Sequence, residues 1–232
     1  MEAKIYESEI DRTAAQNAQA KDLIRSVRRS IQIYEPSAAL RALNESAASI
    51  YLDKVEKDRI RAMIASGYLY AGKLDDAERI SAQALNGSRG KAPLAAWVHG
   101  LAKWRQGLYA QAASSFEVAA YSPYSSGTMV ASSAYWAARA HEKAGHERRH
   151  TQLLKVAADY PRTFYGLLAL AALGEDVDLN WNTPRLSYSD EKDILESAAG
   201  QRAEKLLAAG EVALAEDEIR ALYVKGDADR KK

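Results

Sequence analysis

The chain has 232 residues, of which 47% are hydrophobic and 27% charged, and its net charge is +1 at pH 7. This balance is ordinary for a globular protein, and so small a net charge gives no broad field to attract nucleic acid or an acidic membrane. The absence of Cys excludes disulfides and thiol chemistry. The first ten residues lack the apolar core and cleavage site of a signal peptide, and no apolar run is long enough to span a bilayer.

Apolar residues recur with helical spacing along most of the chain, which predicts an all-helical fold. A long first helix is predicted through Ile5 and Ile31. It ends before Pro36, because a proline disfavours the α conformation in the residue that precedes it. Two further helices are predicted over Ala38–Leu43 and Lys54–Ala71.

A repeat then begins. The segments Gly72–Ala77 and Gly107–Ala112 both place a Gly at a turn and an Ala five residues later, Gly145 begins a third unit, and Gly210–Ala215 begins a fourth. The steps between the first three glycines are 35 residues (72 to 107) and 38 residues (107 to 145). They lie near the period of roughly 34 residues that is typical of tetratricopeptide units.

The best-defined units span about residues 92–123 and 130–161. In both, small Ala and Gly lie where two helices cross, and large aromatic residues fill the outer gaps. A single helical pair cannot bury its apolar face alone, so neighbouring pairs must stack. We therefore predict that residues 1–174 form an α-superhelix, or solenoid, of tetratricopeptide-like helical hairpins.

The rest of the chain departs from this period. Residues 175–189 are polar and rich in turn formers, which predicts a loop. A final helical pair is predicted over residues 190–224, with helices at Ile194–Ala209 and Val212–Tyr223. Residues 225–232 are predicted to form a frayed tail.

Two stretches carry a resemblance to a known family. The sequences YWAARAHEKAG, from Tyr135, and YPRTFYGLLALAALG, from Tyr160, resemble in this order the superhelical region of soluble lytic murein transglycosylases. The match is specific over Ala131–Gly174 and weaker upstream, and the pair at 190–224 resembles the short linker domain of the family. The resemblance implies an all-helical, ring-forming arm that precedes a lysozyme-like catalytic domain. It also implies a periplasmic enzyme that cleaves peptidoglycan glycan and leaves 1,6-anhydro-muramyl ends.

The sequence also departs from that family. The catalytic module carries a Glu-Ser pair at a helix end and then Gly-Leu-Met-Gln, and the latter is absent here. The pair Glu196-Ser197 lies in an amphipathic pattern, where Glu196 is expected to be an exposed helix carboxylate. The resemblance therefore implies a non-catalytic scaffold without a cofactor, and we assign no catalytic residue. Its partners would be glycan strands and a lysozyme-like catalytic domain absent from this chain.

Aromatic and arginine side chains in and near the matched region are candidates for contact with glycan or a partner. Most of them fall at repeat positions that face neighbouring helices, so core packing is the competing interpretation. Thr163 is expected to cap the last helix of the array, and Arg139 to donate hydrogen bonds to a neighbouring helix end. The candidates are Trp104, Tyr135, Trp136, Arg139, Arg162, Phe164 and Tyr165.

Two other functions stay open. The first is a free-standing tetratricopeptide-like module that binds a peptide in its groove. The second is a zinc metallopeptidase, because His146, Glu147 and His150 match the H-E-x-x-H pattern. Against it, His146 is expected at the very start of a helix and no His follows as a third ligand. We predict no metal site, and His146 and His150 are the candidate ligands if one exists.

Overall fold

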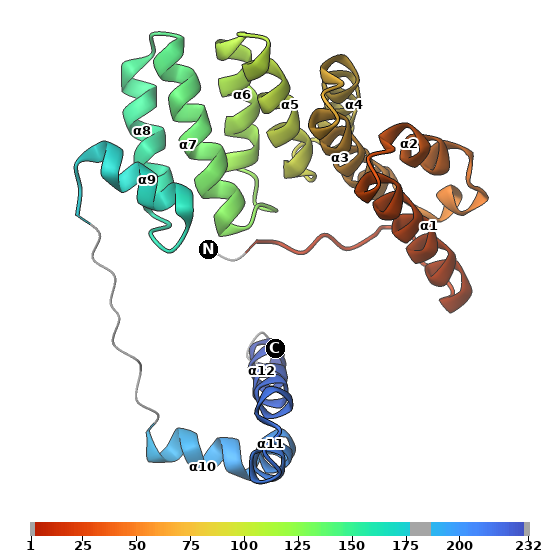
Figure 1. Ribbon diagram of the computed structural model, residues 1–232, viewed down its shortest axis with the longest axis vertical. Helices are drawn as coiled ribbons and strands as arrows, with labels where there is room; N and C mark the ends of the chain where they lie inside the picture. The colour runs from red at the N-terminus through yellow and green to blue at the C-terminus, as the bar shows by residue number, and fades with distance from the viewer. Residues whose placement is uncertain (1–2, 177–186, 230–232) are drawn as a thin grey trace. The chain divides into compact units, whose positions relative to one another are not determined.

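The computed structural model describes residues 3–176 and 187–229, and all regular structure within these residues is helical (Figure 1). This confirms the all-α prediction. The chain divides into two compact units, Met1–Leu179 (unit 1) and Asn180–Lys232 (unit 2). Among the described residues, every helix is too short or too polar to cross a membrane.

Unit 1 contains nine described α-helices and one short 3-10 helix. They are α1 (Ala14–Gln32), α2 (Pro36–Glu45), η1 (Ala47–Tyr51), α3 (Lys54–Tyr70), α4 (Leu74–Ser88), α5 (Pro93–Arg105), α6 (Tyr109–Ala120), α7 (Gly127–Lys143), α8 (Glu147–Ala158) and α9 (Phe164–Leu173). The described part of unit 2 contains α10 (Tyr188–Glu196), α11 (Ala198–Ala208) and α12 (Val212–Asp229).

The helices of unit 1 pack in chain order, as Figure 1 shows. From α3 to α9, each helix packs against the next one in the sequence. In addition, α3 contacts α5, α5 contacts α7, and α7 contacts α9. The odd-numbered helices therefore form a continuous row within unit 1.

The turn between α5 and α6 explains why the repeat needs a glycine. Gly107 has a φ of 75°, in the left-handed region that only glycine enters without a steric cost. Gly72 and Gly145 hold the equivalent places, with φ of 74° and 78°. Ala77 and Ala112, five residues after their glycines, are completely buried where helices cross. The repeat in the sequence is thus a repeat of turn geometry and of close helix contact.

The contact between α5 and α6 is built on one large and one small residue. Phe116 is completely buried, and its ring lies 5.3 Å from that of Trp97, measured between centroids. A Cβ added at Gly100 would lie only 2.5 Å from Phe116 Cδ1. Glycine at position 100 is therefore what admits the Phe116 ring.

The start of α9 shows why Thr-Phe-Tyr-Gly opens this helix. Thr163 Oγ1 accepts a hydrogen bond from the Gly166 backbone N–H at 3.0 Å and donates one to the Tyr160 carbonyl at 2.8 Å. A Cβ at Gly166 would overlap that same carbonyl oxygen. Thr163 caps the helix, as expected. Gly166, Ala169 and Leu170 are buried where α9 packs against α7 and α8.

The predicted first helix is wrong over its N-terminal part. Residues 3–13 are not helical, and α1 begins only at Ala14. Thr13 caps α1 by accepting a hydrogen bond from the Gln16 N–H, while the Gln16 side chain accepts one from the Thr13 N–H. This reciprocal cap fixes the start of the helix. The apolar spacing that includes Ile5 predicts a helix, whereas the residues before Thr13 are not helical.

The helix predicted over Ile194–Ala209 is also wrong, because it is broken at Ser197. Ser197 Oγ donates to the Ile194 carbonyl at 2.6 Å and accepts from the Gly200 N–H at 2.9 Å. These bonds end α10 and cap α11, so the described part of unit 2 holds three helices rather than a pair. Helix α11 packs against both α10 and α12.

The remaining boundaries of unit 2 differ in smaller ways. Helix α10 begins at Tyr188, inside the predicted loop of residues 175–189, of which 177–186 lie outside the described residues. Helix α12 continues to Asp229. The predicted frayed tail of residues 225–232 is therefore helical as far as its last described residue.

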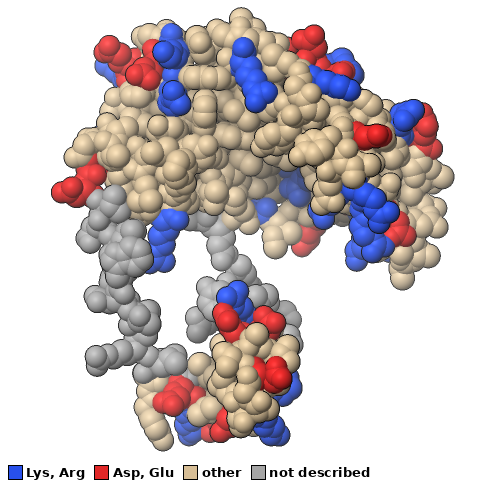
Figure 2. All heavy atoms as spheres, viewed as in Figure 1, with Lys and Arg blue, Asp and Glu red and all other residues tan. Residues whose placement is uncertain are grey.

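Charged side chains of both signs are spread along unit 1. On the face drawn in Figure 2, Lys and Arg lie close to Asp and Glu at several places around the edge of unit 1, and most of the middle of that face is uncharged. This distribution agrees with the near-zero net charge.

Candidate functional site

Three of the predicted contact residues meet in one cluster with a fourth that was not selected. The rings of Trp104 on α5 and Trp136 on α7 lie 5.1 Å apart at 89°, and Tyr109 on α6 lies 5.0 Å from Trp104. The guanidinium of Arg139 stands 5.5 Å from the Trp104 ring and 5.1 Å from the Trp136 ring. We call Trp104, Tyr109, Trp136 and Arg139 the Trp104 cluster.

The Trp104 cluster combines a cation with stacked aromatic faces. Arg139 was expected to donate to a helix end, but its guanidinium lies over the two indole rings, where cation–π attraction holds it. Both indoles and the arginine are half-buried. The Trp136 Nε1–H is buried and has no hydrogen-bond partner among the described residues.

A second set of predicted residues lies at the end of the helical row. Tyr135 on α7 stacks on Tyr165 of α9 with ring centroids 5.5 Å apart, and Phe164 meets Tyr165 edge to face at 5.2 Å. Phe164 is 67% exposed, and Arg162, just before α9, is exposed as well. The seven predicted residues therefore form two groups of three, with Arg162 near the second group.

The H-E-x-x-H residues do not meet as metal ligands. His150 Nδ1 lies 3.0 Å from the Ala138 carbonyl. His146 Nδ1 lies 3.0 Å from Nδ1 of His141 on α7. His146 is the N-cap residue of α8, as its place after the turn glycine predicted. Among the described residues, no three His, Cys, Asp or Glu side chains converge as a metal site would require.

Glu117 on α6 ties this end of α7 and α8 together. Its carboxylate accepts a hydrogen bond from His141 Nε2 at 2.6 Å and pairs with the Arg149 guanidinium. The Arg149 hydrogen bond, with that of His141, outweighs the effect of burial and lowers the pKa of Glu117. This group connects three helices, and its role is to hold them in place.

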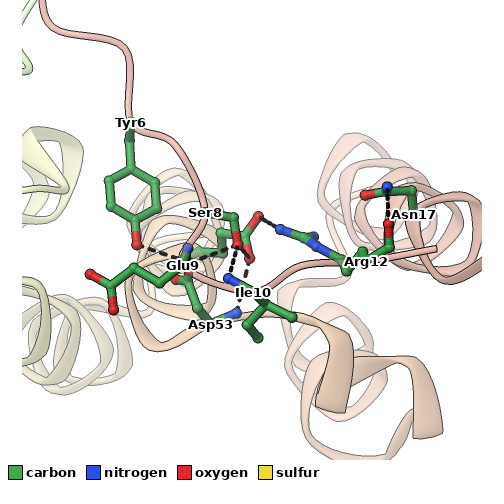
Figure 3. A network of polar contacts seen from close by, with 8 residues as sticks. Tyr6, Ser8, Glu9, Ile10, Arg12, Asn17 and Asp53 are labelled. Carbon is green, nitrogen blue, oxygen red and sulfur yellow. Dashed lines mark hydrogen bonds and ion pairs between the residues drawn. The ribbon is translucent and has the colours of Figure 1, made fainter. Parts of the chain in front are cut away.

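Residues 4–12 form a further site that local sequence patterns do not predict. This N-terminal strap runs to the start of α3, and Figure 3 shows the Tyr6 and Ser8 side chains and the Glu9 backbone directed at Asp53, while the Glu9 carboxylate points away. Asp53 Oδ2 accepts hydrogen bonds from Tyr6 Oη at 2.9 Å, from Ser8 Oγ at 2.9 Å and from the Glu9 backbone N–H at 3.2 Å. One carboxylate oxygen thus holds three consecutive parts of the strap.

The start of α3 is a capping box that also receives the strap. Asp53 Oδ1 accepts from the Glu56 N–H at 2.8 Å, and Glu56 Oε2 accepts from the Asp53 N–H at 2.9 Å. The remaining Glu56 oxygen pairs with Arg12 at 2.6 Å, and the Arg12 side chain is only 9% exposed. Asp53 and Glu56 therefore each use one carboxylate oxygen to cap α3 and the other to bind the strap. In addition, Ser8 Oγ lies within hydrogen-bond distance of Glu56 Oε2, the oxygen that caps the helix.

The N-terminal end of the strap is held by the segment between α6 and α7. The Lys4 backbone N–H donates to the Pro123 carbonyl at 2.8 Å. The Tyr6 ring meets Tyr124 edge to face at 6.4 Å, and the Arg59 guanidinium lies 4.8 Å from the Tyr6 ring. The strap is thus bound at both ends by residues distant in the sequence.

A cavity of about 580 Å³, which we call the strap cavity, lies between the strap and helices α1, α3, α5 and α7. Three cationic residues, Lys4, Arg28 and Arg59, line it. The larger apolar residues that the helices contribute to its walls are Ile24, Ile60, Met63, Leu94 and Met129, and Ile5 and Tyr6 of the strap line it as well. Its volume falls within the range of sites that bind small ligands or single side chains of a partner.

The strap contacts shift the pKa values of two side chains, Asp53 and Tyr6. Burial by itself would raise the pKa of Asp53, but the hydrogen bonds from Glu56, Ser8, Tyr6 and Glu9 outweigh it and lower that pKa. Burial, followed by the hydrogen bond to Asp53, raises the pKa of Tyr6 well above its usual value of 10.0. Both shifts favour the pair in which the tyrosine is neutral and the aspartate is ionised.

Comparisons with known proteins found no match to a family model, to a curated protein or to a solved structure. The case for a function therefore rests on the residues and their arrangement.

Proposed function

We propose that unit 1 is a tetratricopeptide-like superhelix that acts as the non-catalytic scaffold of a peptidoglycan-cleaving lytic transglycosylase. It would position a glycan strand and dock a lysozyme-like catalytic domain, and this role would place it in the periplasm. The proposal grows from the YWAARAHEKAG and YPRTFYGLLALAALG stretches. Its structural support is that the first stretch lies in α7 and the second forms α9, and that these two helices pack against each other and against α8 between them.

The superhelical part of the proposal is supported by the order of the helix contacts. Turn glycines with nearly identical φ recur at 72, 107 and 145. Helix pairs joined by such turns pack in succession, and α3, α5, α7 and α9 touch in sequence. A constant offset between stacked pairs is what curves a solenoid and creates its concave face.

The Trp104 cluster is the observation that carries the glycan-positioning role. Aromatic side chains offer apolar faces at low conformational cost, and Arg139 adds hydrogen-bond donors beside them. Sugar rings present apolar C–H faces rimmed by hydroxyl groups, so this combination suits them. Trp104 and Arg139 are half-buried, which leaves part of each side chain accessible.

Binding to purified peptidoglycan sacculi tests this proposal. We expect the full chain to sediment with sacculi and to release no 1,6-anhydro-muropeptides, as measured by chromatography of the soluble fraction. The variant Arg139→Gln should sediment less, while Tyr34→Phe, at a side chain 77% exposed, should behave as wild type. Equal sedimentation of all three proteins, or none, would contradict glycan positioning by the Trp104 cluster.

A second candidate function is a peptide-binding module. One observation favours it, because the helical array already holds an extended segment, the strap, through Asp53, Glu56 and Pro123. A chain that binds peptides and leaves sacculi in solution would support this function over the first.

A further inference from the structure

We propose that the strap is an internal competitor for a peptide-binding groove, and that the groove accepts an extended peptide of another protein with a bulky apolar side chain. The groove consists of the strap cavity and the strap contacts at Asp53, Glu56 and Pro123. This inference does not depend on a role in peptidoglycan cleavage, because it concerns residues outside the Trp104 cluster.

The strap is bound in the manner of a ligand. It is non-helical, with a bend at Glu9 and Ile10, and its hydrogen bonds to Asp53, the main acceptor, join residues at least 44 positions apart. Two of these bonds come from backbone N–H groups, those of Lys4 and Glu9, which any extended peptide with the same spacing supplies. The groove therefore recognises a backbone direction as well as particular side chains.

The attachment is also weak enough to exchange. Ile5 is 88% exposed, so the bulkiest apolar side chain at this end of the strap contributes little buried area. Most strap contacts are polar and only partly buried, and each such bond has a small net effect because water offers an alternative partner. The Lys91–Glu9 pair, at 3.8 Å, is exposed and adds little.

The strap leaves the strap cavity unfilled. Its walls include Ile60, Met63 and Leu94, yet no strap side chain is buried among them to the extent that Phe116 is buried elsewhere. A peptide that repeats the polar contacts and inserts a large apolar side chain would bury surface that the strap leaves open. Such a peptide would displace the strap.

The charges define the direction and composition of the partner peptide. The end of the groove at Glu56 is acidic and takes a cation, which Arg12 now supplies. The middle, at Asp53, takes hydroxyl groups two residues apart, which Tyr6 and Ser8 supply. The partner peptide therefore carries an apolar residue, then two hydroxyl residues in a Tyr-x-Ser spacing, then a basic residue.

Two variants of the full chain test the strap and the groove separately. The double variant Tyr6→Ala, Arg12→Ala removes strap side chains and leaves the helices untouched. Asp53→Asn preserves a good helix cap but replaces one acceptor oxygen with an amide NH₂, which accepts no hydrogen bond. Both variants should speed hydrogen exchange of the Lys4 and Glu9 amides, which would demonstrate strap release.

The probe is a fluorescein-labelled peptide with the strap sequence AKIYESEIDR, and its binding is followed by anisotropy. We expect it to bind the double variant at least tenfold more tightly than the wild type, and to lose binding to Asp53→Asn. The same peptide with Ile5→Trp, in chain numbering, should bind the double variant more tightly than the original peptide. A scrambled peptide should not bind.

Several results would overturn the proposal. They are equal peptide affinity for wild type and double variant, no binding to either, or unchanged hydrogen exchange in the double variant. Equal or weaker binding of the Trp peptide would remove the role of the strap cavity. A concentration-dependent dimer in light scattering, abolished in the double variant, would instead assign the groove to the strap of a second copy. Sacculus binding is a separate measurement and affects none of these outcomes.

Discussion

The α5–α6 contact and the N-terminal strap hold the same unit together by different physics. At the first, Phe116 is completely buried against Gly100 and Trp97, and apolar packing dominates beside a single His99–Ser115 hydrogen bond. At the second, an extended segment is held mainly through Asp53 and Glu56, and Ile5 is left exposed. Close packing resists any change of volume, whereas polar contacts exchange readily with water.

The comparison separates the packed helices of unit 1, which we call the frame, from the strap, which we propose can detach while the frame stays folded. Substitutions at helix contacts should lower the free energy of unfolding of the whole unit. Substitutions in the strap should change only the fraction of molecules with the strap bound. The predictions below test this division, beginning with the largest expected effect.

Replacing Phe116 with Ala should produce the largest loss. The side chain is completely buried, and its removal leaves a cavity between Trp97 and Trp136, so we expect a loss of about 3–5 kcal/mol in the free energy of unfolding. Urea unfolding followed by circular dichroism measures it. Val118→Ala, on the same helix at a side chain 40% exposed, is the matched control and should cost far less. Similar losses for both variants would contradict the frame assignment.

Replacing Gly166 with Ala should cost less than the loss of Phe116 but still affect the whole of unit 1. The added Cβ would overlap the Tyr160 carbonyl oxygen, so the start of α9 must shift away from α7 and α8. We expect a loss of about 1–3 kcal/mol, as for other overpacked sites. Ala171→Ser, at an exposed position of the same helix, should stay within about 0.5 kcal/mol of wild type. An unchanged unfolding midpoint for Gly166→Ala would contradict this expectation, because it would show that the start of α9 can shift away from the Tyr160 carbonyl at no cost in stability.

The sequence predicted much of the frame because its signals are local. Glycines 72, 107 and 145 stand at turns that require a positive φ, and Thr163 caps α9 through a bond to a residue three positions away. Helical periodicity also placed Trp104 on α5 and Trp136 and Arg139 on α7. That these three meet follows from the contact between α5 and α7, which periodicity alone does not specify.

The sequence failed where structure depends on distant or competing contacts. Ile5 fits a helical spacing, but its segment is drawn into an extended form by Asp53, more than 40 residues away. The Asp53–Glu56 capping box is visible in the sequence as D-x-x-E, yet nothing local reveals that its spare oxygens hold a strap. Helical periodicity predicts a continuous helix through Ser197, although Ser197 and Gly200, three residues later, form the same cap as Thr163 and Gly166.

Acid should release the strap while the frame remains folded. Because folding lowers the pKa of Asp53, its contribution is present above the unfolded value of 3.8 and is lost as the pH falls through the lower folded value. The opposite shift of Tyr6 predicts a second loss as the pH rises above 10.0. A fluorophore on Glu7→Cys, the sole thiol in a chain without cysteine, reports strap release. The probe should respond to acid before circular dichroism does, and simultaneous transitions would contradict the division.

The smallest effect is expected for Tyr6→Phe, which deletes one hydroxyl from the strap. The change removes the 2.9 Å hydrogen bond to Asp53 and keeps the ring against Tyr124 and Arg59. A bond of this kind has a net value of about 1 kcal/mol, which corresponds to roughly a fivefold rise in the open fraction of the strap. Hydrogen exchange of the Glu9 amide measures this rise, and urea unfolding of unit 1 should not change. Tyr70→Phe, at a side chain 75% exposed, controls for loss of a hydroxyl elsewhere. If Tyr6→Phe lowered the urea midpoint as Gly166→Ala does, the strap would belong to the frame and its exchange for a partner peptide would be excluded.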